Sequence, residues 1–225
     1  MSAPAVLRRT KSRFFAKDKA RDPATLAGVA AFSAWRLGVA TIKRMRSAQF
    51  EIEASEQFFD VLREYLVFLI QVADRLAFAR LALPERRVFT VAMARKLADL
   101  AAENEARLLG SGHESAQRRF IDLFNARADD YAQLDFGEGE GQAIAFMRCC
   151  STALLAVVAP PDRAWVADQV MSYEAPEAIA TLRRVLDNTI GTAGSIVAQT
   201  ADPADGPFPE MPGVAPRSDA PMPPE

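Results

Sequence analysis

The sequence predicts an all-α protein, a single compact bundle of six or seven helices with disordered tails at both ends. Half of its 225 residues are apolar, which is enough to bury a sizeable core without disulfides. β-Branched and aromatic residues are few beside Ala, Leu, Arg and Glu, and strict alternation of apolar and polar residues is missing, so there is little to build a sheet from. Proline, glycine and capping residues divide the middle of the chain into helices.

The first two helices follow from a cap and from a long apolar run. Asp22 before Pro23 is typical of an N-cap followed by proline at the first helical position, and this helix should end near Arg46. Ser55 is the predicted cap of the second helix. Its segment 58–78 is apolar on most sides, so it belongs in a core. The predicted buried stripe is Phe58, Leu62, Tyr65, Leu69, Val72 and Leu76.

Two further helices are delimited by proline, glycine and serine. Pro84 marks the beginning of the third helix and Gly110 its end. Ser111, with Glu114 three positions later, predicts a capping box at the beginning of the fourth. The buried side of the fourth helix is predicted to carry Phe120, Phe124 and Tyr131.

The fifth predicted helix, 142–158, is apolar nearly all round, which predicts a central element surrounded by the others. Pro160 and Pro161 end it. A sixth element then holds Trp165, Val166 and Val170. After Pro176, a last helix presents Ile179, Leu182, Leu186, Ile190 and Ile196.

Charge divides the chain into a basic flexible arm (1–21), a helical bundle domain (22–200) and a Pro-rich acidic disordered tail (201–225). Residues 1–22 carry seven basic and two acidic residues, a net charge of +5, and residues 202–225 carry one basic and five acidic residues, a net charge of −4. The middle, 23–201, has a net charge of −3. Eight prolines in the tail remove backbone donors and disfavour helix.

The sequence predicts a cytoplasmic protein without a transmembrane span. The two cysteines, Cys149 and Cys150, are adjacent in an apolar segment, which makes a poor disulfide framework and suggests a reducing compartment. The segment 26–42 is only weakly hydrophobic, and Arg36 near its centre would cost about 2.5 to 3.5 kcal/mol in a membrane. The arginine-rich residues 1–21 leave an organelle-targeting segment as an alternative to a solvated arm.

The inventory of reactive side chains predicts no cofactor, no metal site and no catalytic group, which favours a non-enzymatic protein over an enzyme. The single histidine, His113, falls on a predicted surface turn. An apolar setting raises the pKa of a thiol, so Cys149 and Cys150 are interpreted as core residues. The glycines around Gly137 lack the lysine and hydroxyl residues of a phosphate loop.

Four charged residues with apolar neighbours are the candidate site: Glu64, Asp74, Arg75 and Arg148. Glu64, Gln71 and Arg75 share one helix stripe, and Arg148 is the candidate partner of Asp74. The favoured interpretation is the solvated edge of a buried helix. The alternative is an interior position, where the four would anchor a polar-headed apolar ligand.

Three functional classes follow. The first is a non-enzymatic interaction or assembly factor with a protein partner or a second copy of itself. The second is a bundle that binds a small apolar ligand or lipid. The third is binding to nucleic acid or an anionic membrane surface through the arm, by way of Arg8, Arg9, Lys11 and Arg13.

Overall fold

The computed structural model describes residues 22–137 and 143–190, and within them the protein is helical and has no strand, which confirms the all-α prediction. The predicted arm and tail, and Ile196, lie outside the described residues. The elements are α1 (Pro23–Ser47), α2 (Glu56–Phe78), α3 (Leu83–Leu109), α4 (His113–Ala132), α5 (Ile144–Leu155), the 3-10 turn η2 (Pro160–Asp162), α6 (Arg163–Gln169), the π-helical turn η3 (Val170–Glu174) and α7 (Ala175–Ile190). Since α6, η3 and α7 run on without a break, the described part forms six helical rods.

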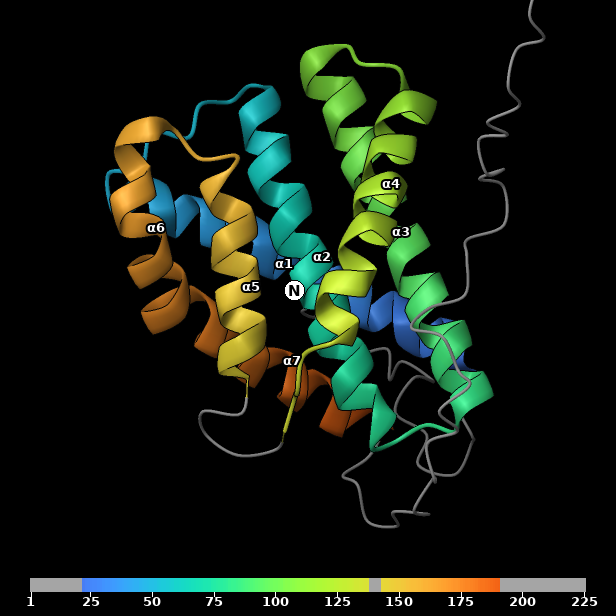
Figure 1. Cartoon of the computed structure of the whole chain (residues 1–225). Helices are drawn as coiled ribbons and strands as arrows, with labels where there is room; N and C mark the ends of the chain where they lie inside the picture. The colour runs from blue at the N-terminus through green and yellow to red at the C-terminus, as the bar shows by residue number, and fades with distance from the viewer. Residues whose placement is uncertain (1–21, 138–142, 191–225) are drawn as a thin grey trace, which may run out of the picture.

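Helix α2 is the central element of the bundle. Residues 61–74 are buried without interruption, and α1, α3, α4, α5 and α7 all pack against this helix. In Figure 1, α1 crosses behind α2, while α4 and α5 lie on either side of it toward the viewer. One hydrophobic core connects residues of all seven α-helices. The long apolar run that predicted a core helix is therefore confirmed.

The prediction that the fifth helix is central is wrong. Helix α5 covers one side of α2 and exposes Ile144, which is 42% accessible, and Arg148. It is also shorter than the predicted helix 142–158, since α5 has 12 residues. A sequence that is apolar all round does not distinguish a surrounded helix from a short helix at the edge, because single exposed apolar residues are normal on a protein surface.

Small residues let α1 lie close to its neighbours. Its buried face includes Ala27, Ala30, Ala31 and Ala34, all fully inaccessible. At Gly38, an added Cβ would lie 2.9 Å from Leu62 Cδ1, so the leucine side chain of α2 would have to shift to admit even an alanine there. Alanine and glycine, which made this segment look weakly hydrophobic, thus serve close helix packing.

The predicted capping residues occupy the cap positions at Asp22, Ser55 and Gly110, and the prediction differs from the structure at Ser111. The Asp22 side chain accepts a hydrogen bond from the Thr25 backbone N–H at 3.1 Å, and Gly110 ends α3 with a φ of 71°. Ser55 precedes α2 but makes no side-chain capping bond. The capping box at Ser111 is wrong, because α4 begins at His113 and its N-cap is Gly112.

Candidate functional site

Glu64 is a buried carboxylate paired with an arginine of a neighbouring helix. It lies on α2 and is 6% accessible. Arg127 of α4 donates to it twice, from Nη2 to Oε1 at 2.7 Å and from Nε to Oε2 at 3.0 Å. This hydrogen bonding raises the pKa of Arg127. The contact fixes the register between α2 and α4.

Asp74 is buried with a weaker set of partners. Thr90 Oγ1 donates to Asp74 Oδ1 at 2.6 Å, and Arg86 Nε lies 3.4 Å from the same oxygen. Burial raises the pKa of Asp74, an effect that Arg86 and Thr90 partly offset. The predicted contact with Arg148 is wrong, because Arg148 lies exposed on α5 and both partners of Asp74 come from α3.

Arg75 caps a neighbouring helix. Its Nη2 donates to the carbonyl oxygens of Tyr131 at 3.1 Å and Ala132 at 3.3 Å, the last residues of α4. The guanidinium also lies 5.7 Å from the ring centroid of Phe146 on α5. Burial lowers the pKa of Arg75. The last carbonyl oxygens of a helix have no partner within the helix, and a cation at the C-terminus can donate hydrogen bonds to them. Through these bonds and its contact with Phe146, Arg75 holds α4 and α5 against α2.

The four predicted residues therefore do not converge on one site. The favoured solvated-edge interpretation is wrong for Glu64 and Asp74, which are buried, and right for Arg148. Gln71, on the same side of α2 as Glu64, is 1% accessible. Its Nε2 is the one buried side-chain polar atom of the described residues that has no hydrogen-bond partner.

The cysteines lie in the packed interior of the described region. Cys150 is buried and Cys149 half-buried, and burial raises the pKa of both thiols. A raised pKa favours the thiol over the reactive thiolate at neutral pH. Among the described residues, no three His, Cys, Asp or Glu side chains are grouped so that they could hold a metal ion.

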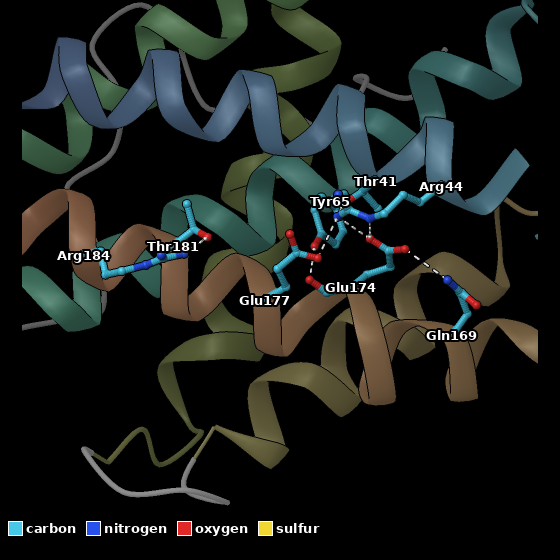
Figure 2. A network of polar contacts seen from close by, with 8 residues as sticks. All are labelled: Thr41, Arg44, Tyr65, Gln169, Glu174, Glu177, Thr181 and Arg184. Atoms are coloured by element: carbon cyan, nitrogen blue, oxygen red, sulfur yellow. Dashed lines mark hydrogen bonds and ion pairs between the residues drawn. The ribbon is translucent and has the colours of Figure 1, made fainter. Parts of the chain in front are cut away.

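A second polar network, which the sequence analysis missed, centres on Glu174 at the end of the π turn (Figure 2). Glu174 Oε2 accepts from Arg44 Nη2 at 2.6 Å and Nε at 2.9 Å, and Oε1 accepts from Gln169 Nε2 at 3.0 Å. The Tyr65 hydroxyl donates to the Glu174 carbonyl at 2.9 Å, and Arg44 also donates to Thr41. The network fastens η3 to α1 and α2.

The π turn sets which side chains face outward. It holds one residue more than an α turn, so two turns that include it span about eight residues instead of about seven. Val166 and Glu174, eight residues apart, are both buried, with 0% and 1% accessibility. Trp165 and Tyr173, the residues before each of them, are 67% and 63% accessible. The extra residue therefore aligns the two aromatic side chains on one exposed side.

We call this exposed side the aromatic face. Between these two residues in the sequence, Ser172 Oγ donates to Asp168 Oδ1 at 3.2 Å, and both Ser172 and Asp168 are exposed. The sequence did not predict this alignment, because residues eight apart are rotated by about 80° on an ideal α-helix and the π turn that removes this rotation has no sequence signal of its own. The aromatic face consists of Trp165, Asp168, Ser172 and Tyr173.

No protein-family model matches this sequence, and the searches of curated proteins and of solved structures found no significant match. The arm residues Arg8, Arg9, Lys11 and Arg13 lie outside the described residues.

Proposed function

We propose that the protein is a non-enzymatic interaction or assembly factor that binds a protein partner through the aromatic face. The observation that supports it is the alignment of Trp165 and Tyr173 by the π turn, each about two-thirds exposed. Tryptophan and tyrosine are enriched where protein interfaces gain most of their binding energy. Exposure of large aromatic rings to water is unfavourable in free energy, and a partner that covers the rings would remove this penalty.

The inner side of the same helix supports a preformed binding surface. Val166 and Val170 are inaccessible, and Glu174 is held by Arg44 and Gln169. A surface fixed by buried packing and charged hydrogen bonds loses little conformational freedom on binding. The exposed Asp168 and Ser172 groups of the aromatic face offer polar contacts of the kind that give an interface its specificity.

The test is quantitative co-purification of tagged full-length wild type and of the double variant Trp165→Ala/Tyr173→Ala. We expect a partner recovered with wild type to be depleted at least tenfold with the double variant, because truncation of one interface hot spot costs about 2 kcal/mol or more. Leu108→Ala is the matched control, since Leu108 is 63% exposed and lies on a different helix, α3.

Equal recovery of every protein by wild type and double variant would contradict the proposal. The same holds if Leu108→Ala depletes the partner as strongly, since the loss would then follow from any removed apolar side chain. Purified partner and a Trp35→Phe protein, in which Trp165 is the remaining tryptophan, give a direct check. Binding should shift the emission of Trp165 to shorter wavelength as water leaves the ring.

A further inference from the structure

Helix α1 carries a second exposed surface, separate from the aromatic face. We call it the basic stripe and define it by Phe32, Arg36, Lys43 and Arg46. Phe32 is 60% accessible and the three basic residues are exposed. Their spacings of four, seven and three place them on one side of the helix, over about 21 Å of its length. The opposite side of α1 packs into the bundle, and Figure 1 shows α1 crossing behind the other helices.

Arg36, Lys43 and Arg46 of the basic stripe form no ion pair with the described residues. Residues 23–47 contain four basic residues and no Asp or Glu, although residues 23–201 as a whole have a net charge of −3. Among the described residues, the one basic side chain of α1 in an ion pair is Arg44, which binds Glu174 and lies near Glu177. Arg36 lies over the Phe32 ring at 6.0 Å, and Arg46 donates to the Ile52 carbonyl.

We propose that the basic stripe docks on the surface of an anionic phospholipid bilayer. Basic residues near such a surface gain attraction from the lipid charge, and an aromatic ring beside them can enter the headgroup region. The N-terminal half of the exposed side supplies Gly28 and Phe32 and no charge, whereas the C-terminal half supplies the cations. That division suits a bilayer surface better than a nucleic acid, whose phosphates would meet cations along the whole length.

By length and composition, α1 is the one helix of the described part that is long and apolar enough to cross a membrane, a test that the core helix of a bundle also passes. In the folded protein, 44% of its apolar window is buried inside the bundle. Docking of the exposed side leaves these buried contacts in place, so the bundle need not open.

The experiment uses full-length Trp165→Phe protein, in which Trp35, half-buried next to the basic stripe, is the remaining tryptophan. It is titrated with vesicles of phosphatidylcholine containing about a quarter phosphatidylglycerol, and with neutral phosphatidylcholine vesicles. We expect co-sedimentation and a blue shift of Trp35 emission with the anionic vesicles alone. Binding should weaken as salt shortens the screening length.

The charge-reversal variant Arg36→Glu/Lys43→Glu should lower the partition coefficient at least twentyfold, since each basic residue near the surface contributes about fivefold. The control Arg95→Glu/Lys96→Glu makes the same change of charge on exposed residues of α3 and should retain most of the binding. If the reversed charges unfold the protein, Arg36→Gln/Lys43→Gln replaces the first variant with the same readout.

Three results would overturn the proposal: equal binding to neutral and anionic vesicles, equal loss in both charge-reversal variants, or unchanged binding of the stripe variant. Retention of a DNA duplex that depends on Arg36 and Lys43, without vesicle binding, would assign the basic stripe to nucleic acid instead. None of these results involves the aromatic face, so the proposed protein partner is tested separately.

Discussion

At the residue scale, the buried charges of this protein differ in how well they are compensated. Glu64 has a two-pronged contact with Arg127 at 2.7 and 3.0 Å, whereas Asp74 has Arg86 at 3.4 Å and one short bond from Thr90. A buried carboxylate needs both a close cation and hydrogen bonds to offset lost hydration. Asp74 lacks a close cation. The loss of hydration on burial therefore outweighs its contacts and raises the pKa of Asp74.

This difference predicts a pH dependence of stability. Because the pKa of Asp74 is raised in the folded state, the folded protein binds more protons than the unfolded chain above about pH 4, the range of an unperturbed aspartate. The stability that Asp74 contributes is complete below that pH and is lost as the pH rises through the raised pKa. The side chain of Asp74→Asn does not titrate. Relative to this variant, the free energy of unfolding of wild type should therefore fall as the pH rises.

Urea unfolding of wild type and Asp74→Asn at a series of pH values measures that difference. Asp129→Asn, on the exposed side of α4, controls for the loss of one negative charge. A wild type that gains stability over Asp74→Asn as the pH rises would show that the contacts with Arg86 and Thr90 outweigh burial.

Gln71 gives a second prediction at this scale. A buried donor without a partner costs about 1 to 3 kcal/mol, so Gln71→Met, similar in shape, should raise the free energy of unfolding by about 1 kcal/mol. Gln169→Met is the matched control and should destabilise, because Gln169 Nε2 donates to Glu174. A less stable Gln71→Met would mean that Nε2 donates to a bound water or ligand, which would favour the ligand-binding alternative.

The charges within the apolar segment 58–78 predicted that partners exist on other helices. They did not identify those partners. Arg127 and Arg86 stand on other helices, and their contacts depend on how α3 and α4 are turned against α2. That rotation is decided by the packing of the whole core, which no local pattern contains. Arg148 was an equally reasonable partner by type, yet it lies on the solvent side of α5.

At the element scale, the π turn connects the buried network with the exposed rings. Without the extra residue, Glu174 and Tyr173 would be rotated relative to Val166 and Trp165, and the aromatic face would be split. The turn is retained by Arg44 and Gln169, which bind the Glu174 carboxylate, and by Tyr65, which binds its carbonyl.

Glu174→Ala should therefore lower the free energy of unfolding by about 1.5 to 3 kcal/mol, the range for hydrogen bonds to a charged group. It should also weaken binding at the aromatic face, although Glu174 itself is buried. Ser172→Ala, an exposed residue of the same turn, is the control and should change stability by less than about 0.5 kcal/mol. Identical denaturation curves for wild type and Glu174→Ala would contradict the role given to this network.

The ends of the helices were easier to predict from the sequence than the way the helices pack against one another. Asp22, Pro84 and Gly110 act locally, so the ends of α1 and α3 could be predicted from the sequence. The error at Ser111 is one of register, since glycine at position 112 took the capping place. The central role expected of the fifth helix required knowledge of its neighbours, and the π turn has no sequence signal of its own.

At the scale of the whole molecule, the described bundle exposes two chemically different surfaces on different helices. The aromatic face on α6 and η3 suits a protein partner, and the basic stripe on α1 suits an anionic bilayer. Each is the outer side of a helix whose inner side is packed in the same core. A protein with both surfaces would bring its partner to a membrane.

Native mass spectrometry of gently purified full-length protein, wild type beside Trp165→Ala/Tyr173→Ala, tests the central claim most directly. Our account predicts that wild type retains an additional protein mass, either a partner or a second copy, and that the double variant has lost it. A monomer in both samples would contradict the account, and a retained small molecule in both would assign the bundle to ligand binding instead.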